Sequence, residues 1–309
     1  MGGMHMDQYF DTLTTETINK ETEHIDACDS LGIVTLINRQ DSQVAGAVEK
    51  ELPQVARAVD ILYDSLSNGG RMFYVGAGTS GRLGVLDASE CQPTYGVSPQ
   101  LVQGYIAGGD YALRNALEGS EDDEDAGSEL IREHGVTDRD TVIGLTASGS
   151  APYVLAAVRT AKELGAKTIG VVTNKDTRLS QIADVTIAPI VGPEAIMGST
   201  RMKSGTAQKM VLNMLTTGVM VRLGKVYNNL MVDMIASNKK LRDRSVRIVR
   251  AATGVDTEEA QRCLDRAEGS VKAAIFMQKT GLSLEQAGKF LESSGGRLKE
   301  AIVRAEENL

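Results

Sequence analysis

A glycine-rich stretch, FYVGAGTSGRLG, is the first part of the sequence whose residues could do chemistry. It contains the pattern G-x-G-x-x-G in Gly76, Gly78 and Gly81, directly after an apolar run that predicts a β-strand. A dinucleotide site would also need an acidic residue about 20 positions further on to hold the ribose, and the corresponding stretch CQPTYGVSPQL has none. A P-loop would need Lys and Ser or Thr where this chain has Arg82 and Leu83. The residues therefore disfavour both kinds of nucleotide site.

Hydroxyl side chains accompany this loop, in Thr79 and Ser80, and also a second loop of the same kind that ends the stretch DTVIGLTASGS. Helix N-termini offer free N–H groups and a partial positive charge, which suit a phosphate monoester. If the strand order is 2-1-3-4-5, both loops flank the topological switch point at which open α/β sheets bind ligands. We predict a sugar-phosphate site here, the alternative being that these residues only form turns. Its predicted binding residues are Gly78, Thr79, Ser80, Thr146, Ser148 and Ser150.

Two carboxylates stand out as candidates for acid–base chemistry. Glu90 lies in LDASEC, one predicted helix after the first loop, and is a candidate functional carboxylate. Glu121 lies in EGSEDDED, an acidic run of the kind that usually forms a solvated face. Composition and spacing give no reason to choose Glu121 over its acidic neighbours.

The composition excludes several classes of protein. The chain of 309 residues is 42% hydrophobic and 24% charged, as in ordinary globular proteins. Its formal net charge of −8 argues against a nucleic-acid partner, and it has neither an apolar run of membrane-spanning length nor a signal peptide. We therefore expect a cytoplasmic protein with no membrane or nucleic-acid partner. The opening MGGMHM is expected to be an expression-vector remnant.

Cysteine and histidine are scarce. The three cysteines, Cys28, Cys91 and Cys263, are widely spaced and suit a reducing compartment better than a disulfide framework. The three histidines show no zinc-like pattern. The sequence indicates neither a metal nor a redox cofactor, so we expect the chemistry to depend on side chains alone.

Short apolar runs alternate with helical stretches through the middle of the chain. This pattern predicts an α/β fold of the flavodoxin-like kind, with a parallel five-stranded sheet flanked by helices. A methionine-rich helix follows over 200–223, and we expect its methionines in a core or dimer contact. We predict an N-terminal helical segment at 12–51, a sugar-phosphate-binding domain at 52–250 and a C-terminal helical domain at 251–309.

The C-terminal domain contains an internal repeat. EEAQRCLDRAEGSVKAAI at 258–275 aligns with EQAGKFLESSGGRLKEAI at 285–302, at a constant offset of 27 residues. Both halves predict a helix, a break at small residues and a second helix, which gives a small, UBA-like helical appendage. We expect it to pack as a cap on the sheet domain or across a dimer, the alternative being a partner-binding module.

Two long blocks of sequence resemble one enzyme family. VGAGTSGRLGVLDASECQPTYG at 75–96 and GPEAIMGSTRMKSGTAQKMVLNMLTTGVMVRLGKVYNNLMVD at 192–233 closely resemble the N-acetylmuramic acid 6-phosphate etherases, which are bacterial enzymes built on the sugar isomerase (SIS) domain. The likeness runs from about Thr14 to the C-terminus. Both blocks are specific to the etherases and to their relative, the glucokinase regulatory protein.

The resemblance implies a lyase reaction. The D-lactyl ether at C3 of N-acetylmuramic acid 6-phosphate would be cleaved, giving N-acetylglucosamine 6-phosphate and D-lactate in the recycling of cell-wall sugars. The family carries one glutamate in DASE and another in EGxED, which match Glu90 and Glu121 here. The resemblance implies Glu90 as the acid for the lactyl oxygen and Glu121 as the base at C2. It also implies a homodimer with shared active sites.

The segment GSTRMK begins the long helix and resembles part of the family's site. By this resemblance Ser199, Thr200 and Lys203 would meet the substrate. Lys203 or Arg201 would pair with the lactyl carboxylate.

The chain departs from the family pattern near its N-terminus. Family members usually carry an Arg-Asn-Pro run after Thr-Glu, whereas here Ile18 and Lys20 stand where Arg and Pro would be. The departure affects the expected affinity for substrate rather than the reaction class.

Two alternative functions remain open. The first is a non-catalytic sugar-phosphate sensor of the glucokinase regulatory protein type, although that regulator is a larger chain with two SIS units. The presence of both glutamates also favours an enzyme. The second alternative is an aldose–ketose isomerase, which would need only proton transfer at C2.

Overall fold

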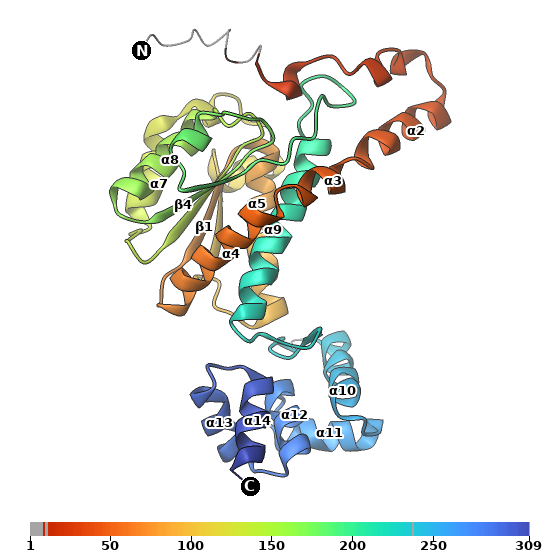
Figure 1. The fold of residues 1–309 in the computed structure, drawn as a ribbon, viewed down its shortest axis with the longest axis vertical. Helices are drawn as coiled ribbons and strands as arrows, with labels where there is room; N and C mark the ends of the chain where they lie inside the picture. Colours follow the sequence, from red (N-terminus) through yellow and green to blue (C-terminus); the bar gives the residue numbers. More distant parts are fainter. Residues whose placement is uncertain (1–8, 10–11, 237, 309) are drawn as a thin grey trace. The chain divides into compact units, whose positions relative to one another are not determined.

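The computed structural model describes residue 9, residues 12–236 and residues 238–308 (Figure 1). The MGGMHM opening, which we expect to be a remnant, lies outside this described part. The chain divides into two compact units. The first unit is Met1–Ser89 with Gln100–Thr216, and the second is Glu90–Pro99 with Thr217–Leu309.

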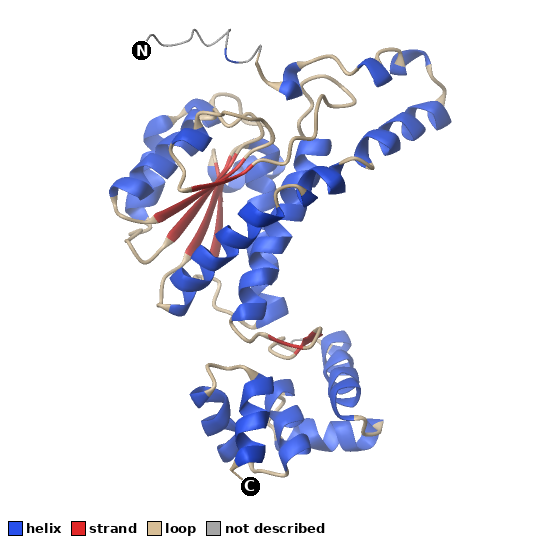
Figure 2. Cartoon of the chain, viewed as in Figure 1, coloured by secondary structure: helices blue, strands red, loops and turns tan. Residues whose placement is uncertain are grey.

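A five-stranded parallel sheet forms the centre of the first unit, with its strands red in Figure 2. The order is β2-β1-β3-β4-β5, which meets the condition set for placing both loops at the switch point. Gly76, at the end of β1, pairs in register with Ile106 of β2 and Leu145 of β3, so the following loops leave the sheet at one edge. The strands are β1 (Met72–Gly76), β2 (Val102–Ile106), β3 (Thr141–Leu145), β4 (Lys167–Val171) and β5 (Val185–Ile187).

Alternate residues of each strand point to opposite faces of the sheet, and both faces are covered. Phe73 and Val75 of β1 belong to one core cluster together with residues of α7 and α8. Tyr74 lies between them and is buried on the other side, where its hydroxyl donates to Asp87 Oδ2 of α5 at 2.9 Å. The flanking helices are α4 (Leu52–Ser67), α5 (Gly78–Tyr95), α6 (Gly109–Arg114), α7 (Glu124–Glu133), α8 (Pro152–Glu163) and α9 (Lys203–Arg222).

The N-terminal segment of the first unit is helical, as predicted. It begins with three short 3-10 helices and continues into two α-helices. Together with α4 these elements precede the sheet in the chain (Figure 1). They are η1 (Thr14–Glu16), η2 (Lys20–Thr22), η3 (Ile25–Ala27), α2 (Ser30–Asp41) and α3 (Val44–Glu49).

The second unit contains a short hairpin and a group of helices. Each helix of its last pair begins and ends 27 residues after its counterpart in the preceding pair, which confirms the predicted repeat. The matched positions Ile275 and Ile302 are both buried in one core. The elements are β6 (Val226–Tyr227), β7 (Leu230–Met231), α10 (Lys239–Thr253), α11 (Thr257–Arg266), α12 (Val271–Thr280), α13 (Leu284–Ser293) and α14 (Leu298–Glu307).

The core of this second unit includes residues that precede the repeat. Ile248 and Val249 of α10 are buried in the same cluster as the repeat helices. Helix α10 packs against α11 and α12, although most of it falls within the predicted range 52–250. The predicted ranges 52–250 and 251–309 remain a prediction, as do the alternatives of a cap and a partner-binding module.

A buried lysine joins the hairpin region of the second unit to the repeat. Lys272 Nζ donates to Asp233 Oδ2 at 2.7 Å, to the Gly224 carbonyl at 3.0 Å and to the Gly296 carbonyl at 2.9 Å. All three ammonium hydrogens therefore have an acceptor. Burial lowers the pKa of Lys272, and the Asp233 carboxylate acts against that shift.

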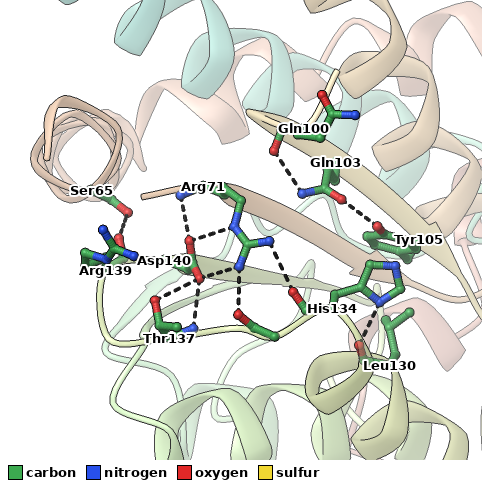
Figure 3. A network of polar contacts seen from close by, with 11 residues as sticks. Ser65, Arg71, Gln100, Gln103, Tyr105, Leu130, His134, Thr137, Arg139 and Asp140 are labelled. Carbon is green, nitrogen blue, oxygen red and sulfur yellow. Dashed lines mark hydrogen bonds and ion pairs between the residues drawn. The ribbon is translucent and has the colours of Figure 1, made fainter. Parts of the chain in front are cut away.

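An ion pair joins the starts of two neighbouring strands of the sheet. Arg71 and Asp140 directly precede β1 and β3, and Figure 3 shows the network around them. The Asp140 carboxylate accepts from the Arg71 main-chain N–H at 2.8 Å, from Arg71 Nη2 at 2.9 Å and from the Thr137 N–H at 2.8 Å. Burial alone would raise the pKa of Asp140, but these hydrogen bonds outweigh it and hold the pKa below its usual value.

We expect Asp140→Asn to lower the free energy of unfolding by about 2–4 kcal/mol at neutral pH, because Arg71 loses a buried partner. Since the folded pKa of Asp140 is lowered, its contribution is complete above the unfolded pKa of about 3.9 and is lost as the pH falls through the folded value. Urea unfolding at neutral pH and at acid pH measures the difference.

A matched control is Glu285→Gln, which removes an exposed carboxylate paired with Lys289 at 2.7 Å. It should cost less than about 0.5 kcal/mol. Equal losses in the two variants, or an Asp140→Asn loss that does not shrink at acid pH, would contradict this account of the ion pair.

Candidate functional site

The first glycine loop brings the start of α5 against the ends of β1 and β2. A Cβ added at Gly76 would lie 2.7 Å from the Gly81 nitrogen, and one added at Gly81 would lie 2.6 Å from Ile106 Cγ1. Gly78 has a φ of 52°, a left-handed conformation that favours glycine. The three glycines therefore serve close packing and an unusual backbone conformation, and no dinucleotide is needed to explain them.

The second loop carries a chain of hydroxyl groups. The Thr146 and Ser148 oxygens lie 3.3 Å apart, and the Ser148 and Ser150 oxygens lie 2.9 Å apart. Gly149 between the serines has a φ of 70°, and a Cβ there would lie 2.2 Å from Thr177 Cβ. The structure thus brings together the three hydroxyl residues predicted for this loop, immediately before α8.

The side chains of Thr79 and Ser80 in the first loop lie against α9. The Ser80 hydroxyl donates to Gln208 Oε1 at 2.8 Å, and both residues are buried. A Cβ added at Gly205 would lie 3.4 Å from Thr79 Cγ2, which places Thr79 next to the first turn of α9. The Gln208 Nε2 group is buried without a hydrogen-bond partner in the described part of the chain.

Gln208 and Glu194 were not predicted from the sequence. Glu194 is fully buried and caps α9: its carboxylate oxygens accept from the Lys203 N–H at 2.8 Å and the Ser204 N–H at 2.9 Å. Each lies within the second block that resembles the etherases. The available signal for Gln208 was a polar residue within the apolar helix predicted at 200–223.

Lys203 contacts the N-terminal segment. Its side chain is 1% exposed, and its Nζ donates to Gln40 Oε1 at 3.0 Å. Burial lowers the pKa of Lys203, while the charges of Glu194, Asp41 and Glu21 act against that shift. A role toward the lactyl carboxylate stays a prediction. The same holds for Ser199 and Thr200, which are half-buried in the turn before α9.

The N-terminal segment docks beside the second loop through Asn174, which follows β4. Asn174 Oδ1 accepts from the Thr14 N–H at 2.8 Å, and its Nδ2 donates to the Ala147 carbonyl at 3.0 Å. Ile18 and Lys20, the positions that depart from the family pattern, are both exposed. The observed docking therefore does not depend on either side chain.

Glu121 lies with the glycine loop. A cavity of about 310 Å³ is lined by Gly78 and Arg82 from the first loop and by Glu121 and its neighbours. Although Glu121 is exposed as a residue, partial burial of its carboxyl group raises its pKa, and the nearby Asp122 raises it further. Glu118 and Asp122 of the same acidic run also line this cavity, so the lining of the cavity alone does not select Glu121. Asp123 of this run caps α7, accepting from the Ala126 N–H at 2.9 Å.

Glu90 belongs to the second unit, where it is exposed on α5. It is therefore not part of the grouping described in the first unit, and its pairing with Glu121 stays a prediction.

A second cavity, of about 410 Å³, contains none of the predicted site residues. It lies beside β2 and α7, and Tyr105, Tyr153 and Glu129 are among its lining residues. Burial, with smaller effects of Asp123 and Tyr105, raises the pKa of Tyr153 to about 12.

Within the described ranges, no group of three or more His, Cys, Asp or Glu side chains is arranged to hold a metal ion. No helix in the same ranges is both long and apolar enough to cross a membrane.

The chain is similar to known proteins over most of its length. Residues 54–162 match the model of the glucokinase regulatory protein N-terminal SIS domain, and residues 125–218 match that of the SIS domain. An N-acetylmuramic acid 6-phosphate etherase of Clostridium acetobutylicum is 54% identical over 275 residues, covering 89% of this chain and 91% of that relative. A relative of the same name from Symbiobacterium thermophilum is 58% identical over 270 residues, covering 87% of this chain and 90% of that relative. Among solved structures, a phosphoheptose isomerase from Francisella tularensis has a TM-score of 0.49 at 17% identity, covering 63% of this chain and 100% of that chain.

The parallel sheet, its two hydroxyl-bearing loops and the matching models define an SIS-domain protein. The likeness to the curated relatives is closer and extends over most of the chain. The chain belongs to the N-acetylmuramic acid 6-phosphate etherase family, as the sequence resemblance predicted.

The second loop gives a test of the site's construction. We expect Gly149→Ala to lower the free energy of unfolding by about 2–4 kcal/mol and to weaken sugar-phosphate binding, because its Cβ must displace Thr177 as well as strain the backbone. Gly69→Ala is the matched control, since Gly69 has a φ of 77° but no atom within 4 Å of the added Cβ. It should cost only about 1–2 kcal/mol and leave binding unchanged. Thermal unfolding and isothermal titration measure both, and equal effects would refute the crowding argument.

Proposed function

We propose that this chain cleaves the D-lactyl ether of N-acetylmuramic acid 6-phosphate, giving N-acetylglucosamine 6-phosphate and D-lactate. The curated relatives are named for the etherase. The observation that carries the proposal is that Glu121 and Gly78 line one cavity. A carboxylate with a raised pKa thereby lies beside the loop that we expect to bind the phosphate.

Glu121 is the proposed base at C2. In the open-chain sugar, the aldehyde at C1 makes the C2 proton acidic. The Glu121 carboxylate takes that proton, and the electron pair expels the lactyl oxygen from C3, which leaves an α,β-unsaturated aldehyde. Burial, and then Asp122, raise the pKa of Glu121 and so make its carboxylate a stronger base.

Glu90 is the proposed acid. The departing alkoxide is a poor leaving group, so Glu90 protonates it and D-lactate leaves. Water then adds its hydroxyl to C3 and returns a proton to the Glu90 carboxylate, while Glu121 returns its proton to C2. The supporting argument for Glu90 is its place in the DASE motif.

The phosphate-binding groups are proposed to be the two loops and the helix N-termini that follow them. The Ser148–Ser150 contact supports this role, because clustered hydroxyls can donate to an anion without adding charge. Ser80 donates its one hydroxyl proton to Gln208, so a phosphate would have to replace Gln208 as the acceptor. For the lactyl carboxylate, Arg201 is the better of the two basic candidates. Its side chain is exposed, whereas Lys203 Nζ is buried against Gln40.

We place this activity in the cytoplasm and in a homodimer with shared active sites. Within the described ranges, Cys28 and Cys263 are free thiols, which suits a reducing compartment. Helix α2 supports a dimer, because Leu31 is 72% exposed and Val34 is 58% exposed in the single chain. A second copy would remove this apolar surface from water.

The first experiment is incubation with N-acetylmuramic acid 6-phosphate in oxygen-18 water, followed by mass analysis of both products. Label in the sugar is expected, because water adds at C3 after elimination. Label in the lactate would mean that another bond breaks and would remove both assigned roles.

Glu121→Gln should lower lactate release by about 10²–10⁴-fold and stop C2 proton exchange with solvent.

This substrate and a second sugar phosphate separate the alternatives. Binding without lactate release would favour a sensor. Ketose formation from a 6-phosphosugar that lacks the lactyl group would favour an isomerase. The names of the curated relatives favour the etherase over the sensor.

The pH dependence tests the base. Because the pKa of Glu121 is raised, kcat/KM should fall on the acid side at a higher pH than an ordinary glutamate would give. Asp122→Asn removes the smaller of the two causes and should move this acid limb to lower pH, while Asp125→Asn, in the same run, should leave it in place. An identical limb in both variants would argue against Glu121 as the group that titrates.

A further inference from the structure

The side chain of Arg82 is committed to main-chain carbonyls at the end of α6. Its Nη2 donates to the Ala112 carbonyl at 2.7 Å and to the Asn115 carbonyl at 3.0 Å, and its Nε donates to the Leu113 carbonyl at 3.0 Å. Arg82 follows Gly81 directly, so the guanidinium extends from the most tightly packed point of the glycine loop. In the sequence, Arg82 served only as an argument against a P-loop.

These acceptors are the carbonyls that a helix leaves unpaired. The last carbonyls of a helix have no partner within it and carry the negative end of the helix dipole. A guanidinium presents several N–H groups in a fixed plane, so one arginine can satisfy three carbonyls at once. A lysine at the same position would keep the charge but not this geometry.

The chain that leaves α6 carries Glu121. After Asn115 it forms an exposed loop, and Glu121 lies in the short helix η4 (Ser120–Asp122). The Ser120 hydroxyl donates to the Leu117 carbonyl at 3.1 Å, and this bond lies within the segment itself. Arg82 ties the beginning of the segment to the glycine loop. Arg82, Asn115 and Glu121 all line the 310 Å³ cavity.

We propose that Arg82 is a positioning residue for Glu121, holding the segment that carries the base at a fixed distance from the phosphate-binding loop. This inference rests on the proposed function. It assigns no contact between Arg82 and the substrate. Arg82 acts through the end of α6 and the residues that follow it.

The test compares Arg82→Gln and Arg82→Lys with Arg114→Gln in the full chain. Arg114 is exposed in the last turn of α6, and removing its charge makes it a matched control. We expect Arg82→Gln to lower kcat for lactate release by about 10²-fold with KM within about twofold, because a misplaced catalytic group reacts slowly while ground-state binding remains. Arg82→Lys should recover part of the loss, and Arg114→Gln should match the original chain. An unchanged kcat, or a raised KM alone, would overturn the proposal.

Amide hydrogen exchange gives a readout that does not need activity. In the unliganded chain, exchange over 115–122 should be about tenfold faster in Arg82→Gln than in Arg114→Gln, since the anchored segment opens more often. Unchanged exchange would overturn the positioning role even if kcat falls. Faster exchange in a chain that never releases lactate would reject the proposed function and keep Arg82 as the anchor. If Arg82→Gln does not fold, as judged by its thermal transition, the Arg82→Lys comparison decides.

Discussion

The close approach of the start of α5 to the ends of β1 and β2 is the constraint on which the first unit depends. Gly76 and Gly81 have no Cβ, and neither position has room for one. The helix can therefore begin where the strand ends, with Gly78 in a left-handed conformation and Arg82 within reach of α6. The loop that we propose to bind phosphate and the segment that carries the proposed base are both placed by this contact.

A second set of contacts, entirely polar, holds the N-terminal segment on the same unit. Asn174 uses its oxygen for Thr14 and its nitrogen for Ala147, so a single amide connects the segment to the second loop. Lys203 reaches Gln40 in the same way. Because Asn174, Gln40 and Lys203 are buried, each is left unsatisfied when its partner is lost, which makes the docking specific.

Sequence patterns predicted the sheet and the repeat because both depend on local periodicity and short connections. Alternating apolar runs and helices fix a parallel sheet, and the offset of 27 residues was visible as matched letters before it was visible as matched helices. Glu121 is different, since its acidic neighbours have the same chemistry. Only the fold shows that it lines a cavity with Gly78, as Glu118 and Asp122 also do, so the choice of Glu121 among them comes from the family resemblance.

Other site features could not be predicted because their partners are far away in the sequence. The burial of Lys203 follows from Gln40, and the orientation of Ser80 follows from Gln208. Spacing rules describe neighbours within one element, and these contacts join elements that meet only in the folded chain. Glu194 was missed for the same reason, since a cap nine residues before the helix nitrogen it binds has no fixed pattern.

The docking of the N-terminal segment also has a consequence for folding during synthesis. Thr14 bonds to Asn174 and Gln40 bonds to Lys203, across 160 and 163 positions of the chain. At about 5–20 residues per second, a ribosome takes roughly 10–30 s to make these partners after it has made the segment. Until then the nascent chain offers the segment none of these native hydrogen bonds. The N-terminal segment therefore gains these contacts only after β1 to β4 have been made.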